Sequence, residues 1–220
     1  MYYGMILVCM AIISLVDIFI VSPHFAFDAW FGSTAVFIIL SVIIIVAAVI
    51  IIDAITATFV RWCLPKSLFT EDKKGFMAGK KECRFYEKIG IKKWKDKIAE
   101  LGMFTNFRKN KISDPKNPEY IKRYIMEANY GVSVHLTGII FGFAVIFVYP
   151  LKYWLCFGLP IAIVNAFYNA MSLIILRYNL PKLHTLYKFN MRHKKADEPK
   201  AEQKTPEETA ESEAAATETK

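Results

Sequence analysis

The hydrophobic residues of this chain gather in four long runs, which polar segments separate. The runs cover about residues 3–21, 33–60, 132–149 and 153–176. A helix needs roughly 20 apolar residues to cross the hydrocarbon core of a bilayer, so each run predicts a transmembrane helix. The third run is short, but the residues before it can lengthen its helix. The sequence therefore predicts an all-α polytopic membrane protein with about four transmembrane helices.

The segment between the second and third runs is amphipathic rather than loop-like. Aromatic and aliphatic residues are interleaved with lysines, and around residues 84–101 they partly follow helical spacing. This pattern is typical of a helix that lies in the headgroup plane with its lysines reaching toward water. We expect Gly90 to divide that helix in two. Asn117 followed by Pro118 predicts the start of a new helix, which continues without a break into the third run.

These patterns divide the chain into three parts. Residues 1–32 form an additional N-terminal transmembrane helix and an outer loop; no basic residue or cleavage site marks a signal peptide there. Residues 33–195 form a membrane-embedded domain, whose interfacial segment covers residues 61–131. Residues 196–220 contain too few large apolar side chains to offset the chain entropy of folding, so we expect a disordered tail.

Basic residues predict the orientation of the chain in the membrane. Residues 61–130 carry 18 Lys and Arg against 9 Asp and Glu, and residues 177–195 add six basic residues and no acidic one. Because basic loops stay on the cytoplasmic side, both termini and the middle segment are expected in the cytoplasm. The net charge of +8 indicates attraction to anionic lipid rather than nucleic acid, since no base-reading motif is present. The four cysteines lack the spacing of a metal site.

Two of the apolar runs carry small or polar residues at regular helical spacing. The residues of the two stripes are Gly131, His135, Gly138 and Gly142 on the third helix, and Asn165, Asn169 and Ser172 on the fourth. Polar side chains are costly at bilayer depth unless they meet a partner, and glycines let helices approach closely. Only a few residues around Pro150 join the two helices. We therefore expect an antiparallel hairpin in which the stripes face each other.

The polar residues near the cytoplasmic ends of this hairpin predict an interfacial pocket. Its expected lining consists of Glu127, His135, Asn169, Arg177 and Asn179. A structural alternative stays open, because a membrane histidine can bond a backbone carbonyl and helix asparagines often join neighbouring helices. The basic residues after Arg177 also fit a membrane anchor. Asp17 and Asp53 lie near the ends of their runs and are assigned structural roles.

Three ordered motifs resemble the glycosyl-4,4'-diaponeurosporenoate acyltransferase family. The first is FYEKIGIKKWKDKI at residues 85–98, and the second pairs Glu127 with His135. The third places Asn169 eight residues before Arg177-Tyr178-Asn179, with Pro181 and Leu183 beyond. The family is bacterial and membrane-embedded, and it is named for the last step of staphyloxanthin-type carotenoid synthesis. The resemblance covers about residues 36–195 and leaves out the first hydrophobic run and the tail.

The resemblance implies a cell-membrane enzyme that transfers a fatty acyl chain without a cofactor. The donor would be a cytoplasmic thioester of coenzyme A or acyl carrier protein. The acceptor would be a sugar hydroxyl of a membrane-bound glycosyl carotenoid or related glycolipid. In that reaction His135 is the general base, Glu127 orients it and Asn169 donates to the oxyanion. The implied substrate-binding residues, some of them for the phosphates of the donor, are Arg177, Asn179, Trp94 and Lys95.

Other functions stay open on the residues alone. The chain also fits a non-enzymatic membrane scaffold or lipid-binding subunit with an amphipathic cytoplasmic belt. A different lipid-modifying enzyme, such as a methyltransferase, is a further alternative. The sequence holds no GxSxG, Walker, GxGxxG or HExxH motif, which argues against the enzyme classes that these motifs identify.

Overall fold

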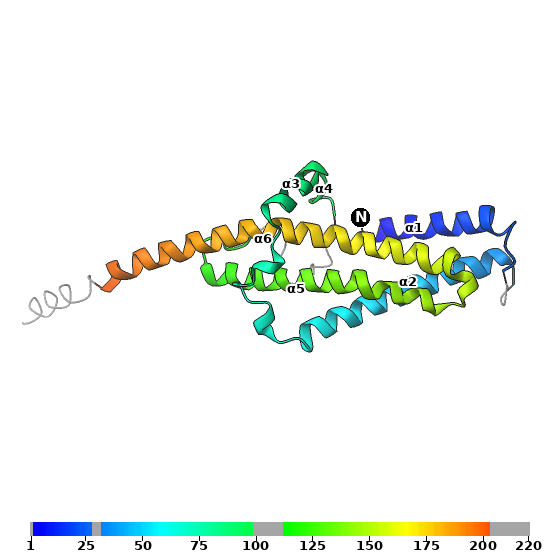
Figure 1. Ribbon diagram of the computed structural model, residues 1–220, viewed down its shortest axis with the longest axis horizontal. Helices are drawn as coiled ribbons and strands as arrows, with labels where there is room; N and C mark the ends of the chain where they lie inside the picture. The colour runs from blue at the N-terminus through cyan, green and yellow to red at the C-terminus, as the bar shows by residue number, and fades with distance from the viewer. Residues whose placement is uncertain (1, 28–31, 99–111, 203–220) are drawn as a thin grey trace, which may run out of the picture.

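The computed structural model describes residues 2–27, 32–98 and 112–202, and every regular element in these ranges is helical (Figure 1). The long helices are α1 (Tyr2–Val16), α2 (Thr34–Trp62), α5 (Pro118–Gly142) and α6 (Leu159–Glu202). A π-helical turn (Asp17–Val21) extends α1, and a 3-10 helix (Phe143–Val148) extends α5. Within the described ranges, four helices are long and apolar enough to cross a membrane. The predicted all-α membrane architecture is therefore confirmed.

The helices α5 and α6 form the predicted antiparallel hairpin. Their connection contains Pro150, a short 3-10 helix (Leu151–Tyr153) and a π-helical turn (Trp154–Gly158). The 44 residues of α6 span about 66 Å at 1.5 Å per residue, about twice the thickness of a hydrocarbon core. The helix therefore extends well past the bundle at its C-terminal end, as Figure 1 shows.

The start of α5 confirms the signal read from the sequence. The Asn117 side chain accepts hydrogen bonds from the backbone N–H groups of Glu119 and Tyr120, at 3.0 and 3.3 Å. Pro118 occupies the first helical turn, where a missing N–H costs nothing. From there α5 runs without a break to Gly142. The same helix thus links the interfacial segment to the membrane-spanning hairpin.

The helix α6 extends into the segment that the sequence assigns to the tail. The backbone of α6 stays helical through Glu202, beyond the expected boundary at Lys195. Residues 203–220 lie outside the described part of the chain.

The segment after α2 wraps around the hairpin. It contains two 3-10 turns (Lys66–Leu68 and Lys74–Phe76), then α3 (Lys80–Lys88) and α4 (Ile91–Trp94). Gly90 has a φ of +75°, a left-handed conformation that suits glycine, and it separates α3 from α4 as predicted. Figure 1 shows the segment leaving α2, crossing the hairpin and ending in the α3–α4 arm beside α6.

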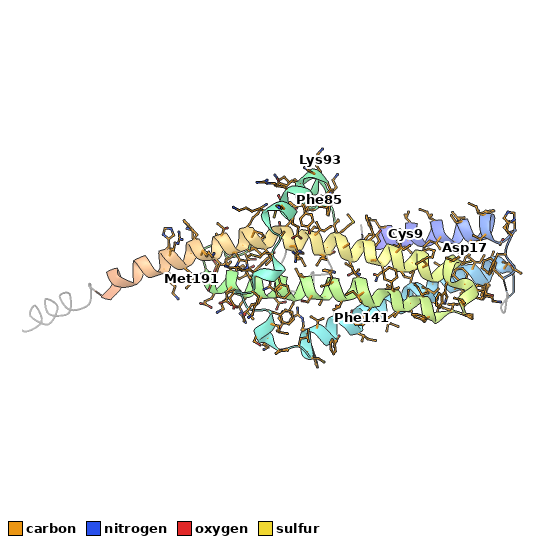
Figure 2. The ribbon with its side chains drawn as sticks, viewed as in Figure 1. Cys9, Asp17, Phe85, Lys93, Phe141 and Met191 are labelled. Carbon is orange, nitrogen blue, oxygen red and sulfur yellow. The ribbon has the colours of Figure 1, made fainter. Side chains whose placement is uncertain are left out.

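The helices α3 and α4, here called the α3–α4 arm, bury part of their apolar residues against α6 and expose the rest. Tyr86 and Ile91 are buried with Tyr178 of α6, so this part of the apolar face packs on the bundle instead of on lipid. Phe85 and Ile89 stay exposed on the same arm. Figure 2 shows Phe85 and Lys93 on the projecting arm. The amphipathic character was thus predicted from the sequence, but its division between protein and membrane surface was not.

Candidate functional site

A polar cluster lies where α2, α5 and α6 meet. His135 Nδ1 is 2.9 Å from Asn169 Oδ1. Asn169 Nδ2 donates to Asp53 Oδ2 at 3.3 Å, and also to the backbone oxygen and Oδ1 of Asn165, at 3.2 and 3.1 Å. Asn165 Nδ2 in turn donates to Asp53 Oδ1 at 3.4 Å. One carboxylate, two amides and one imidazole therefore form a connected hydrogen-bond network.

The network determines which nitrogen of His135 carries the proton. The backbone carbonyl of Asn165 can only accept, so the Asn169 amide must turn its N–H₂ group toward that carbonyl and toward Asp53. Its Oδ1 then faces His135, and an amide oxygen also only accepts. His135 must donate from Nδ1, so the neutral imidazole has its lone pair on Nε2. The tautomer suits a general base that acts through Nε2.

The glycine stripe makes room for this network, as its spacing predicted. A Cβ atom placed on Gly138 would lie 2.9 Å from Asn169 Oδ1. One placed on Gly142 would overlap the Asn165 amide, and one on Gly131 would lie 2.8 Å from Leu176. Close helix approach through glycine is common in membrane bundles. The contacts of Gly138 with Asn169 and of Gly142 with Asn165 therefore confirm that the two stripes face each other, whereas Gly131 meets Leu176, outside the predicted stripe.

Asp53 is the member of this cluster to which the sequence analysis gave only a structural role. It was judged to lie near a helix end, but α2 continues to Trp62, about two and a half turns further on. The side chain consequently lies inside the bundle rather than at its edge. An acidic residue in an apolar run is as costly as a histidine there without a partner, so the rule that points to His135 also points to Asp53.

Glu127 has a different partner from the one expected. Its carboxylate is 2.6 Å from the guanidinium of Arg61, and that guanidinium lies over the Tyr130 ring at 5.4 Å. This ion pair joins the end of α2 to α5. The structure brings His135 into contact with Asn169, and the role of Glu127 in orienting His135 stays a prediction.

Arg177 is anchored to the wrapping segment. Its guanidinium pairs with both carboxylate oxygens of Glu82, at 2.7 and 2.8 Å, and donates to the carbonyls of Gly75 and Met77, at 3.1 and 3.2 Å. The hydrogen bond from Arg177 is the main cause that lowers the pKa of Glu82 to about 2. The expected substrate clamp thus fastens residues 75–82 to α6, at the point where the segment crosses that helix.

The other expected substrate-binding residues lie near the same crossing. Trp94 packs against the buried cluster that includes Ile91 and Tyr178, and its indole N–H donates to the Ile89 carbonyl at 3.2 Å. Asn179 and Lys95 are each half-buried. Their roles toward substrate stay predictions.

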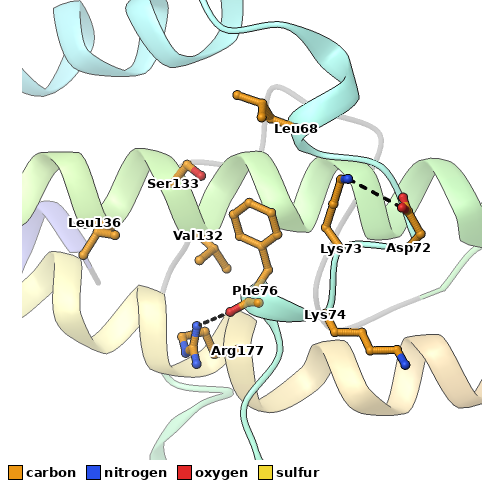
Figure 3. A pocket seen from close by; sticks show the side chains of 10 residues that line it. Leu68, Asp72, Lys73, Lys74, Phe76, Val132, Ser133, Leu136 and Arg177 are labelled. Carbon is orange, nitrogen blue, oxygen red and sulfur yellow. Dashed lines mark hydrogen bonds and ion pairs between the residues drawn. The ribbon is translucent and has the colours of Figure 1, made fainter.

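A cleft of about 640 Å³ opens between the wrapping segment and the hairpin (Figure 3). The lining residues are Leu68, Asp72, Lys73, Lys74, Gly75, Phe76, Val132, Ser133, Leu136 and Arg177. Its α5 wall spans residues 132–136, the turn that also carries His135. On a helical wheel His135 is about 60° from Val132. The cleft and the polar cluster therefore occupy neighbouring faces of one stretch of α5.

The comparisons with known proteins give one match. The family model for glycosyl-4,4'-diaponeurosporenoate acyltransferase matches residues 65–189, which is more than half of the chain. That range holds His135, Asn169 and Arg177 but begins after Asp53. Searches of curated proteins and of solved structures returned no match. The chain belongs to the glycosyl-4,4'-diaponeurosporenoate acyltransferase family.

Proposed function

We propose that this protein transfers a fatty acyl chain from a thioester donor to a hydroxyl group of a membrane-bound sugar lipid. Membership of an acyltransferase family supports the reaction class. The observation that carries the proposal is the hydrogen bond between His135 Nδ1 and Asn169 Oδ1, at 2.9 Å. It holds an imidazole in the tautomer that a general base requires, next to a cleft at one end of a membrane bundle. The acceptor is a glycosyl carotenoid or a related glycolipid.

In the proposed reaction, His135 Nε2 takes the proton of the acceptor hydroxyl. The hydroxyl oxygen attacks the thioester carbonyl, so that a C–O bond forms and the C–S bond breaks. The imidazolium returns its proton to the thiolate that leaves. Proton transfer of this kind contributes about 10²- to 10⁴-fold to the rate of enzymes that use it. No group beyond the two substrates is consumed.

Asp53 is proposed as a positioning residue. Its carboxylate accepts from both asparagine amides, so it keeps Asn169 Oδ1 directed at His135. Its negative charge also favours the imidazolium that forms during the reaction. Asn169, which we expected to donate to an oxyanion, has Nδ2 occupied by the Asp53 and Asn165 acceptors. We therefore propose that Asn169 orients the base.

We propose that the end of the bundle with the wrapping segment faces the cytoplasm of a bacterial cell. The basic excess of residues 61–130 supports this orientation. A cytoplasmic donor, acyl-coenzyme A or an acyl carrier protein, then approaches from the side on which the cleft opens. The lipid acceptor approaches from within the bilayer.

The direct test compares lipids of cells that express the wild type, His135→Ala or His193→Ala at matched membrane levels. His193 is an exposed histidine on α6 and serves as the matched control. We expect an acyl-sized mass gain on a glycolipid or glycosylated carotenoid with the wild type and the control, but not with His135→Ala. The same lipid profile for all three proteins would contradict the proposal and favour a membrane scaffold.

A further inference from the structure

The cleft combines cationic and apolar walls. Lys73 and Lys74 supply positive charge, with Asp72 3.6 Å from the Lys73 ammonium, whereas the charge of Arg177 is matched by Glu82. Figure 3 shows Phe76 in the middle of the cleft between the wrapping segment and α5, with Leu136 toward one end. A volume of about 640 Å³ is in the range of sites that bind small organic ligands, roughly 300–1,000 Å³. The chemistry fits an amphiphile with a phosphate-bearing head.

The apolar wall continues onto the outer surface of the bundle. Leu136 lines the cleft and is 47% exposed, and Ile140 and Phe143 follow it at 59% and 37%. The spacing of four and three residues places them on one side of α5 and of the 3-10 helix that extends it. Because α5 belongs to a membrane-spanning hairpin, this stripe faces lipid. A hydrocarbon chain that leaves the cleft at Leu136 would stay on an apolar surface.

The position of the cleft favours the acyl donor as its occupant. The base His135 lies on the same stretch of α5 as Val132, Ser133 and Leu136. An acyl thioester with its phosphates beside Lys73 and Lys74 and its chain beyond Leu136 has its carbonyl between the two, level with the α5 wall of the cleft. The donor carbonyl must reach that level for the acceptor oxygen to attack it.

We propose that this cleft binds the phosphate-bearing end of an acyl-coenzyme A donor, with Lys73 and Lys74 as the cations that contact phosphate. The inference rests on the proposed acyl transfer, and it adds a binding site to it. It also moves the expected phosphate contacts away from the lysines of residues 92–97. There Lys92 pairs with Glu87 at 2.8 Å, a closer contact than the 3.6 Å between Lys73 and Asp72.

Binding of palmitoyl-coenzyme A to the purified full-length protein in detergent tests the site without requiring turnover. The variant is Lys73→Glu/Lys74→Glu. The matched control is Lys80→Glu/Lys81→Glu, which makes the same charge change at exposed positions in the first turn of α3. We expect the dissociation constant to rise about tenfold or more for the cleft variant and less than about twofold for the control.

Filling the cleft with a large side chain gives a second, independent test. Ser133→Trp places a large side chain in the cleft, whereas Ile140→Trp places it on the lipid-facing stripe outside the cleft. We expect Ser133→Trp to weaken palmitoyl-coenzyme A binding about tenfold and Ile140→Trp to leave it unchanged. Circular dichroism and gel filtration of each variant show whether the fold is retained.

The outcomes separate this site from the proposed function. Loss of binding in both cleft variants, with both controls intact, supports the donor site even if no turnover is detected. Equal binding by all variants overturns the inference while leaving the role of His135 untouched. Retention of phosphatidylglycerol that depends on Lys73 and Lys74, with unchanged palmitoyl-coenzyme A binding, also overturns it, because the cleft would then hold a lipid headgroup.

Discussion

Two polar networks hold the bundle and its wrapping segment together, and they differ in chemistry. Around His135 the partners are amides and one carboxylate, and Asn169 is only 9% exposed. Around Arg177 the partners are a carboxylate and backbone carbonyls, and the Arg177 and Glu82 side chains are 23% and 29% exposed. The first network orients the His135 imidazole, whereas the second holds residues 75–82 against α6. Two polar residues of the same helix, Asn169 and Arg177, thus serve different purposes.

The comparison predicts that loss of Asn169 affects chemistry far more than stability. Asn169→Leu removes the acceptor of His135 Nδ1 and one donor of Asp53. We expect turnover to fall about a hundredfold or more, because the imidazole loses its fixed tautomer. The control is Thr137→Val, since the Thr137 hydroxyl bonds only carbonyls of its own helix among the described contacts. Rates are measured in proteoliposomes, and equal rates for the two variants would contradict the assignment.

A smaller loss of turnover is expected when the Asn169 amide is displaced rather than removed. The Cβ atom of Gly138→Ala would lie 2.9 Å from Asn169 Oδ1, so the amide must shift by a few tenths of an ångström. We expect turnover to fall about tenfold. Gly79→Ala is the control, because a Cβ atom there meets nothing within 4 Å. Full activity of Gly138→Ala would show that the close approach of α5 and α6 at this position does not affect His135.

The Arg177 network is expected to affect stability instead. Arg177→Ala removes two hydrogen bonds to Glu82 and two to backbone carbonyls. We expect a loss of about 1–3 kcal/mol in unfolding free energy in detergent, with earlier proteolysis of residues 75–82. Arg177→Lys keeps the charge but not the paired geometry, and should fall between the wild type and Arg177→Ala. Unchanged stability in both variants would contradict the role of Arg177 in holding residues 75–82 on α6.

The same ion pair predicts the smallest effect, a dependence of stability on pH. The pKa of Glu82 is lowered from 4.5 to about 2 in the folded protein. Its contribution is therefore fully present well above pH 4.5 and is lost as the pH falls toward 2. The stability difference between the wild type and Glu82→Gln should shrink over that window. Thermal melts at pH 7, 4 and 3 measure it, and a constant difference would contradict the role of ionised Glu82.

The sequence predicted the parts of the fold that depend on local rules. Apolar run length predicted the membrane helices, the Asn117–Pro118 cap predicted the start of α5, and Gly90 predicted the break between α3 and α4. The facing of the glycine and asparagine stripes also followed from helical spacing. Each of these features is determined within one helix or one short hairpin.

Pairings between distant segments were not predictable in the same way. Glu127 with Arg61, and Arg177 with Glu82, join residues 66 and 95 positions apart. The spacing of residues along one helix does not predict which segment from elsewhere in the chain packs against that helix. The sequence places Asp53 near the end of its apolar run, and nothing in its spacing indicates its asparagine partners on α6, more than a hundred residues later.

A double-mutant cycle between Asp53 and His135 tests the central claim most directly. Turnover is measured in proteoliposomes for the wild type, Asp53→Ala, His135→Ala and the double variant, at equal amounts of folded protein. If Asp53 acts by positioning the base through Asn169, its removal costs nothing further once His135 is gone. We predict that the double variant and His135→Ala have the same residual rate. Single losses that multiply in the double variant, or wild-type turnover in His135→Ala, would contradict the account.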